Sequence, residues 1–489
     1  MLTLKKLILI IILALPGVLW LQFRYQWVNE KPLHGFFIKN MESPDLKRFT
    51  WDRWFKGEFQ QEYMTRTENH IGYRKTWIRL RNQLDYSFFK ICNSEGFVAG
   101  KKGYLYEEDY ILEYTGDYFI GGKPLDKKML RLKNVYDSLK ANNIELILVF
   151  EPGKASIIPE YIPGRYHPQK RKPSNYNYIK QKALCSGLPF LDLNSYFLLL
   201  KDTTRYPLFP KYGMHWSLYG VALAADTLKN YIAGRTGQNL PDISVEKIEL
   251  SDTPRLSDND IGVILNLCLP LPPTQGAYPV LKIEDDKAKR DLSVLVIADS
   301  YYLNFCEGIS EKLFKNQEYW YYNHKLYPYQ DNNPPQYVDK TDLLRTYKKF
   351  NVILLMVSEI NMHNGFWNFA DEAYLAFHPE VKDDHVYMTE NEIRNERTWF
   401  KFLCKKAKGQ DRPLEEVIRN DAEYTFFNNY NDIQGKTRQD SIIHLVLSIQ
   451  NDPNWMSAIR KKAAERNVSL DTMLYRDANY LYDQSKQNR

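Results

Sequence analysis

The stretch "LSVLVIADS", Leu292–Ser300, decides the fold of this chain. It is apolar without alternation, and two further runs, "LILVF" (Leu146–Phe150) and "NVILLMVSE" (Asn351–Glu359), have the same character. Continuous apolar runs of this length are typical of parallel strands that helices cover on both faces. Helix-like segments alternate with them along the chain. The sequence therefore predicts an α/β layered fold with a mostly parallel sheet.

Polar residues stand where these predicted strands end. Ser300 follows one apolar run, Glu151 another and Glu359 a third. Reactive groups and ligands gather at the carboxyl ends of strands in such sheets. A further strand is predicted over "LPFLDLNSYF" (Leu188–Phe197), which contains Asp192. These ends are where we expect a site.

One histidine lies in a suggestive position. His215 stands in "FPKYGMHWSLYG" (Phe209–Gly220), before a helix-like run that ends at Gly234. A serine nucleophile needs a base within hydrogen-bond reach and donors for the oxyanion. His215 could serve Ser300 as that base, or it could be a packed histidine beside Trp216. The residue types alone leave both roles open.

The N-terminus indicates membrane targeting. Lys5 and Lys6 precede an apolar run from Leu7 to Phe23, and no small-residue cleavage site follows it. An uncleaved anchor over residues 1–25, with the body on the periplasmic side of the inner membrane, is favoured over a cleaved signal. Residues 26–95 have helical spacing and are predicted to form a stem.

Composition narrows the class of protein. The chain has 489 residues and a formal net charge of +6, and its Lys and Arg residues are dispersed, which argues against nucleic acid as a partner. The five cysteines include no CxxC pair, and no His/Asp/Glu cluster has metal-ligand spacing. We expect neither a metal nor a cofactor.

The last hundred residues contain an internal repeat. Residues 393–424 match residues 449–480 at a constant offset of 56, and Trp399 pairs with Trp455. Each unit reads as two helices joined by a turn. We interpret residues 376–489 as helical hairpins that serve packing or docking.

Four motifs in order carry a resemblance. They are "GKKGYLY" (Gly100–Tyr106), "VFEPGKASIIPEYIP" (Val149–Pro163), "GMHWSLYG" (Gly213–Gly220) and "ADSYY" (Ala298–Tyr302). The chain resembles the SGNH-hydrolase-like O-acetyltransferases of the AlgJ/AlgX (DHHW) type, which are periplasmic or membrane-anchored and acetylate exopolysaccharides. The resemblance covers about residues 50 to 370, and residues 96–375 would form the SGNH-like domain.

The resemblance implies roles for individual residues. Ser300 would be the nucleophile and His215 the general base, with Asp299 and Trp216 in support. An acetyl group would rest on Ser300 before it passes to a hydroxyl of an exported polysaccharide. The donor would be a membrane acyl-donor protein.

Two positions depart from the family pattern. The family's Asp two residues before the histidine is Gly213 here, and the glycine before its Asp-Ser pair is Ala298. The Asp orients the histidine, so another acid would have to replace it, and Glu359, Glu151 and Asp192 are the candidates. With such an acid the domain would be an O-acetyltransferase or esterase. Without one it would be a catalytically degenerate domain that binds glycan or assembles with partners.

Overall fold

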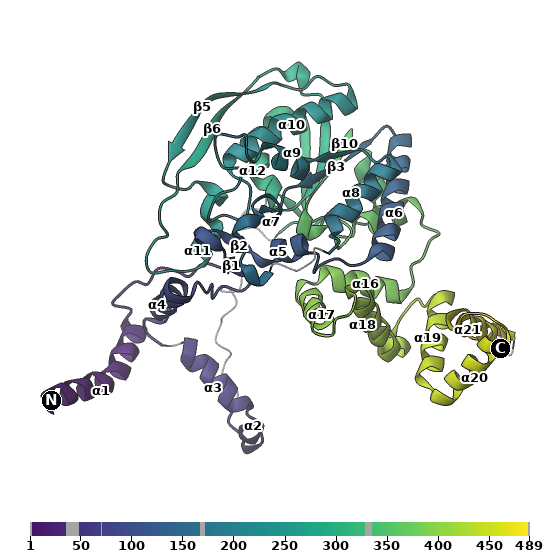
Figure 1. Ribbon diagram of the computed structural model, residues 1–489, viewed down its shortest axis with the longest axis horizontal. Helices are drawn as coiled ribbons and strands as arrows, with labels where there is room; N and C mark the ends of the chain where they lie inside the picture. The colour runs from purple at the N-terminus through teal and green to yellow at the C-terminus, as the bar shows by residue number, and fades with distance from the viewer. Residues whose placement is uncertain (1, 36–47, 70, 167–171, 328–334, 488–489) are drawn as a thin grey trace.

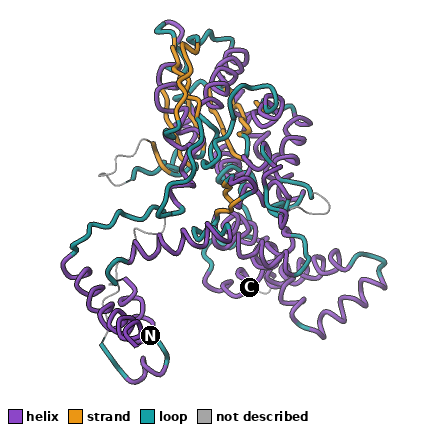
Figure 2. Tube along the Cα trace, turned by 60° about the vertical axis from the view of Figure 1, so that its left-hand side comes forward, coloured by secondary structure: helices purple, strands orange, loops and turns teal. Residues whose placement is uncertain are grey.

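A computed structural model describes residues 2–35, 48–69, 71–166, 172–327 and 335–487 of the chain. Its centre is a six-stranded sheet in the order β4-β3-β10-β7-β8-β9. Figure 2 shows strands gathered among the helices. The first five strands run parallel and β9 is antiparallel. The predicted α/β fold with a mostly parallel sheet is therefore confirmed. The strands are β3 (Glu145–Glu151), β4 (Phe190–Asp192), β7 (Ser293–Ala298), β8 (Asn316–Tyr321), β9 (Lys325–Tyr327) and β10 (Val352–Ser358).

Helices cover both faces of the sheet, which explains the continuous apolar runs. In β3, Leu146, Leu148 and Phe150 face one core, whereas Ile147 and Val149 face the other. All five side chains are fully buried. The first core includes residues of α6 (Gly122–Ala141), α8 (Asn175–Ser186), α14 (Leu343–Tyr347) and α15 (Phe369–Phe377); the second includes residues of α7 (Lys154–Ile157), α9 (Leu193–Leu200), α10 (Leu218–Thr236), α12 (Leu303–Phe305) and α13 (Glu311–Leu313).

Two predicted elements have different bounds in the structure. Of the strand expected over Leu188–Phe197, only Phe190–Asp192 is extended. The carboxylate of Asp192 accepts a hydrogen bond from the Ser195 amide at 3.0 Å, and this N-cap starts α9 at Leu193. The helix expected to end at Gly234 continues to Thr236 and stops at Gly237, which has a positive φ of 69°.

Two antiparallel hairpins accompany the sheet. The first joins β1 (Phe97–Ala99) to β2 (Leu105–Glu107), and α5 (Glu108–Thr115) follows it. The second pairs β5 (Ile243–Ser251) with β6 (Gly276–Ile283), and the sequence analysis did not predict it. Between β5 and β6 the chain makes a long excursion that contains a 3-10 turn, Leu256–Asn259, and the short helix α11 (Asp260–Ile264). This excursion proves central to the site.

Helices α1 (Leu2–Tyr25), α2 (Trp51–Phe55) and α3 (Glu58–Asn69) extend away from the sheet domain (Figure 1). Helix α4 (Arg74–Leu84) lies against the domain, since its buried Asn82 donates a hydrogen bond to the carbonyl of Leu265. Within the described part of the chain, one helical stretch, Leu4–Tyr25, is long and apolar enough to cross a membrane, with a mean hydropathy of 2.2. Residues 26–35, here called the strap, lead from α1 back to the domain without helix or strand.

Six helices follow the domain and keep the 56-residue offset of the sequence repeat. They are α16 (His385–Asn395), α17 (Arg397–Gly409), α18 (Leu414–Asn429), α19 (Arg438–Asn451), α20 (Pro453–Glu465) and α21 (Leu470–Gln487). Asp411 and Asn467, 56 residues apart, both turn the chain with a positive φ. Helices α17 and α18 contribute to a core shared with the sheet, while α20 and α21 help to form a separate core further out (Figure 1).

Candidate active site

Ser300 lies at the carboxyl end of β7, near the middle of the sheet. The strand ends at Ala298, and Asp299 caps a 3-10 turn, Ser300–Tyr302, by accepting a hydrogen bond from the Tyr301 amide at 3.1 Å. The cap bends the chain sharply at the sheet edge. The hydroxyl of Ser300 is thereby turned out of the strand.

The structure brings His215 to this serine. Its Nε2 atom lies 2.8 Å from Ser300 Oγ, although 85 residues separate the two in sequence. The histidine sits in the loop before α10, whose N-terminus is capped by Ser217. Trp216 is 1% exposed, and its ring packs edge-on against Tyr301 at 5.3 Å. The buried neighbour therefore fixes the loop, while His215 faces the serine.

A carboxylate that the sequence analysis did not single out meets the other side of the imidazole. Asp260 Oδ2 lies 2.7 Å from His215 Nδ1. Its Oδ1 accepts hydrogen bonds from the amides of Met214, at 2.9 Å, and of Ile261, at 2.7 Å. Serine, histidine and aspartate thus form one continuous hydrogen-bonded row, the arrangement that activates a serine nucleophile.

The three acids predicted for this role lie elsewhere. Glu359 Oε2 accepts a hydrogen bond from Ser156 Oγ at 2.6 Å. Asp192 caps α9 and binds the hydroxyl of Tyr176. Glu151 is fully buried beside Asp299. None of the three is hydrogen-bonded to His215 in the described residues, and the acid that contacts it is Asp260 instead.

The geometry at Gly213 explains why the acid comes from another segment. A Cβ atom at position 213 would lie 2.4 Å from the carbonyl oxygen of Ser257 and 3.1 Å from the carbonyl carbon of Asp258. The excursion that carries Asp260 therefore fills the space that a side chain at 213 would need. Asp260 lies 45 residues after His215, in a stretch without a periodic signal, so only the pairing of β5 with β6 brings it back.

A buried lysine holds the loop before His215. Lys154 Nζ donates to the carbonyl oxygens of Gly213, at 2.7 Å, and Lys211, at 3.0 Å. Burial lowers the pKa of Lys154 to about 7, against the opposing charges of Asp260 and Asp258. Burial also raises the pKa of Asp258 to about 6. The loop thus rests on an ammonium group that is costly to keep charged.

Asp299 ties the nucleophile's turn to the neighbouring strand. Its Oδ2 accepts hydrogen bonds from the amide of Ser358 at 3.1 Å, the hydroxyl of Ser358 at 2.6 Å and Asn361 Nδ2 at 2.9 Å. Burial and the adjacent charge of Asp299 raise the pKa of Glu151 well above its usual range. A buried carboxyl group with a raised pKa therefore lies beside an Asp299 that already has several donors.

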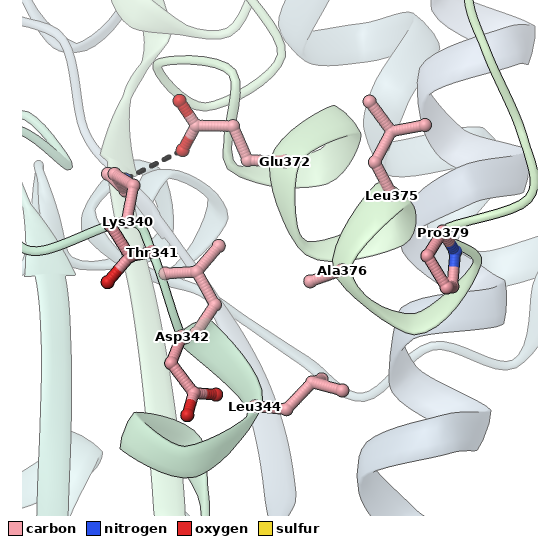
Figure 3. A pocket seen from close by; sticks show the side chains of 9 residues that line it. Lys340, Thr341, Asp342, Leu344, Glu372, Leu375, Ala376 and Pro379 are labelled. Carbon is pink, nitrogen blue, oxygen red and sulfur yellow. Dashed lines mark hydrogen bonds and ion pairs between the residues drawn. The ribbon is translucent and has the colours of Figure 1, made fainter.

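Two hollows differ in their relation to this row of residues. One, of about 540 Å³, includes Asp260 in its wall, together with His34 and Gly35 of the strap and Leu256, Asn259 and Val263 of the excursion. The other, of about 470 Å³, lies between α14 and α15, where Lys340 pairs with Glu372 (Figure 3). The lining of the second hollow includes none of Ser300, His215 and Asp260. Only the first adjoins the candidate site.

Comparison with known proteins shows which part of this chain resembles a known family. Residues 97–267 match the family model described as an SGNH hydrolase-like domain, acetyltransferase AlgX. This range contains Gly213, His215 and Asp260 and ends before Ser300. The probable alginate O-acetylase AlgJ of Pseudomonas aeruginosa is 24% identical over 172 residues, which are 35% of this chain and 42% of that protein. The match thus spans less than half of the relative's length.

Two solved structures are similar to this chain at low identity. The O-acetyltransferase domain of Pseudomonas putida AlgJ is 17% identical, with a TM-score of 0.37, and covers 55% of this chain and 92% of that one. Pseudomonas aeruginosa AlgX is 12% identical, with a TM-score of 0.40, and covers 60% and 71%. The resemblance that the four motifs predict is confirmed: residues 97–267 are similar to the SGNH-hydrolase-like domain of AlgJ/AlgX-type O-acetyltransferases.

Proposed function

We propose that this protein transfers an acyl group, through a covalent ester on Ser300, to a hydroxyl group of an exported or cell-surface polysaccharide. The observation that carries the proposal is the row Ser300–His215–Asp260, with contacts of 2.8 Å and 2.7 Å. A degenerate domain would not be expected to retain all three groups in register. Asp260 supplies the acid that Gly213 lacks, which favours an enzyme over a glycan-binding or assembly protein.

In the first half of the reaction, His215 Nε2 takes the proton of Ser300 Oγ as that oxygen attacks the acyl carbonyl. The carboxylate of Asp260 holds Nδ1–H and stabilises the imidazolium that forms. When the tetrahedral intermediate collapses, the bond between the acyl carbon and its donor breaks, and Nε2 returns the proton to the departing group. The acyl group is left as an ester on Ser300.

In the second half, a sugar hydroxyl replaces the donor. His215 takes the proton of this hydroxyl, the sugar oxygen attacks the ester, and Ser300 leaves with the proton from Nε2. The backbone amide of Ser300, at the start of its turn, is placed to donate to the oxyanion in both halves. Water in place of the sugar would make the same site an esterase.

The setting of the site supports an extracytoplasmic role. The helix Leu4–Tyr25 would anchor the chain in the inner membrane, with residues 26–95 as the stem and residues 96–375 as the catalytic domain on the periplasmic side. The acyl donor would then be presented by a membrane protein. Residues 376–489, with their repeated helices, would serve packing or docking. The relative named above is a probable alginate O-acetylase, which supports a polysaccharide as the acceptor.

The test uses the full-length protein in detergent and a small acetyl ester as donor. We expect release of the alcohol and transient acetylation of one serine, identified as Ser300 by peptide mass spectrometry. A serine-directed phosphonate should label the protein, and Ser300→Ala should lose labelling and turnover. Ser244→Ala, on the exposed strand β5, is the matched control and should keep both. Equal turnover in Ser300→Ala would refute the proposal, and glycan binding without turnover in the unmutated protein would favour the degenerate alternative.

A further inference from the structure

The segment that carries Asp260 is held at its far end by the N-terminal part of the chain. Three consecutive residues after the start of α11 take part. The carbonyl of Ile264 accepts a hydrogen bond from Ser94 Oγ at 2.7 Å, and the carbonyl of Leu265 accepts one from Asn82 Nδ2 at 2.9 Å. Both donors lie in the segment 26–95, outside the residues that match the family model.

Asn266 makes the contact with the strap. Its Oδ1 accepts a hydrogen bond from the His34 amide, and its Nδ2 donates to the His34 carbonyl, both at 2.8 Å. The same Nδ2 also donates to the carbonyl of Ile264 at 2.8 Å. Asn266 is only 6% exposed and has a positive φ of 50°, a conformation that asparagine tolerates better than most residues. The side chain therefore clamps the strap backbone to the end of α11.

Two further contacts hold the first half of the strap. Gln22 of α1 exchanges two hydrogen bonds with the backbone of Val28, at 2.7 and 3.1 Å. Glu30 accepts hydrogen bonds from the amide and hydroxyl of Thr76 in α4, both at 2.7 Å. The strap is thus a braced connection between the apolar helix and the segment that bears Asp260.

The length of α11 makes this clamp relevant to the imidazole. Asp260 is the first residue of the helix and Ile264 the last, so they are about 6 Å apart at 1.5 Å per residue. On the other side, buried Ile261 and Leu265 pack with Leu105 and Tyr212. The apolar contacts hold the helix against the domain, and the polar clamp holds the residues just after its last turn. A misplacement of about 1 Å in a catalytic group can cost roughly 100-fold in rate.

We propose that Asn266 is a positioning residue for the Ser300–His215–Asp260 row, and that through it the strap is part of the acyl-transfer machinery. The inference rests on the proposed function, since it concerns how the orienting acid of that reaction is placed. The strap then does more than connect the apolar helix to the domain. It sets the angle at which Asp260 meets His215.

The test compares two variants that break the clamp from opposite sides. Asn266→Gly removes the side chain but keeps a residue that accepts positive φ, and His34→Pro removes the amide donor of the strap. We expect each to lower kcat for acetyl-ester turnover roughly 10- to 100-fold with little change in KM. The double variant should be no worse than the stronger single one, because both break the same contact.

Two controls keep the test specific. Gln83→Ala removes a stem-to-domain hydrogen bond of 2.9 Å to the Leu269 amide, which lies beyond the clamp, and should leave kcat unchanged. Asn266→Asp keeps the acceptor for the His34 amide but loses the donor, so it should fall between wild type and Asn266→Gly. All variants are compared well below their melting temperatures. Should Asn266→Gly fail to fold, His34→Pro and Asn266→Asp decide.

A spectroscopic signal separates this inference from the proposed function. A hydrogen bond from a histidine Nδ1–H to a carboxylate gives a far-downfield proton resonance, which can be assigned with His215→Gln. The resonance should weaken or vanish in Asn266→Gly and His34→Pro and persist in Gln83→Ala. Unchanged kcat and an unchanged resonance in the clamp variants would overturn the inference, even if Ser300→Ala is inactive. Full activity of Ser300→Ala would refute the proposed function, while the resonance would still report on the clamp.

Discussion

Gly213 and Asp260 depend on each other. A side chain at position 213 would collide with the backbone of Ser257 and Asp258, and those residues lead directly into Asp260. The histidine loop and the β5–β6 excursion therefore fit together only if the loop has no side chain there. Position 213 carries no acid here: another segment fills the space beside it and presents a carboxylate to His215 Nδ1.

The first prediction concerns Asp260 itself. Asp260→Asn should lower kcat by roughly 10³- to 10⁴-fold, since an amide at this position favours the wrong imidazole tautomer. The matched control is Asp258→Asn, which changes a carboxylate two residues away that no recorded hydrogen bond links to His215. We expect the control to stay within a few-fold of wild type in steady-state acetyl-ester hydrolysis. Equal losses in the two variants would mean that the excursion matters only for folding.

The second prediction concerns the space at Gly213. Gly213→Ala should lower the free energy of unfolding by about 1–3 kcal/mol, because its methyl group meets backbone atoms that cannot turn aside. Gly234 offers the matched control, since it lies inside α10 and a Cβ there meets nothing within 4 Å. Gly234→Ala should be neutral or stabilise by up to about 1 kcal/mol. Urea denaturation measures both, and a harmless Gly213→Ala would contradict the steric argument.

The sequence predicted the parallel sheet, Ser300 and His215, but it did not predict Asp260. Apolar runs such as Leu292–Ala298 reveal buried parallel strands because their side chains on both faces must avoid water. Their ends then identify Ser300, and a motif identifies His215. Asp260 has no such signal. It ends the polar stretch Ser257–Asp260, and the sequence of this stretch is the same as that of an ordinary solvated turn. Its role follows from a long-range strand pairing that no local pattern encodes.

The same limit explains why the sequence predicts Glu359, Glu151 and Asp192, and not Asp260, as the acid that orients His215. Glu151 and Glu359 were chosen because they end strands, and both do lie at that edge of the sheet. Which carboxylate faces a particular ring depends on side-chain direction and on the loops between strands. Those are set by tertiary packing, so the choice among strand-end acids could not be made from the chain alone.

The third prediction concerns the buried ammonium of Lys154. Lys154→Met leaves the carbonyls of Gly213 and Lys211 without their donor, which costs roughly 1–3 kcal/mol. The pKa of Lys154 is about 7 in the folded protein and about 10.4 in an unfolded chain. Stability from this group is therefore present above pH 10 and is lost as the pH falls towards 7. Hence the deficit of Lys154→Met relative to wild type should be largest near pH 10 and should shrink towards pH 7.

Chemical denaturation between pH 6.5 and pH 10 measures this difference. The matched control is Lys211→Met. Lys211 is a neighbouring lysine that binds Lys154 only through its backbone carbonyl. Its stability relative to wild type should not change with pH in the same way. A deficit of Lys154→Met that is constant across this range would show that the ammonium is not buried as described.

The fourth prediction concerns Glu151, and its sign is opposite. Burial beside Asp299 raises the pKa of Glu151 well above the value of about 4.3 in an unfolded chain. Stability from a group with a raised pKa is present below the unfolded value and is lost as the pH rises towards the folded one. Glu151→Gln is uncharged at every pH and has nearly the same shape as the glutamate. The variant should therefore match wild type near pH 4 and become more stable than wild type as the pH rises through neutrality.

The comparison variant for this experiment is Glu246→Gln, on the exposed strand β5, which should follow the wild-type stability curve throughout. Because Asp299 holds the turn that presents Ser300, Glu151→Gln also tests whether the proton on Glu151 matters for the reaction. If the proton on Glu151 only prevents a second buried negative charge beside Asp299, the kcat of Glu151→Gln at pH 7 should stay within a few-fold of wild type. Its free energy of unfolding should then be higher than that of wild type. A variant that is less stable than wild type at pH 8 would mean that Glu151 is ionised in the folded protein and that a cation-like partner, not a proton, offsets its charge.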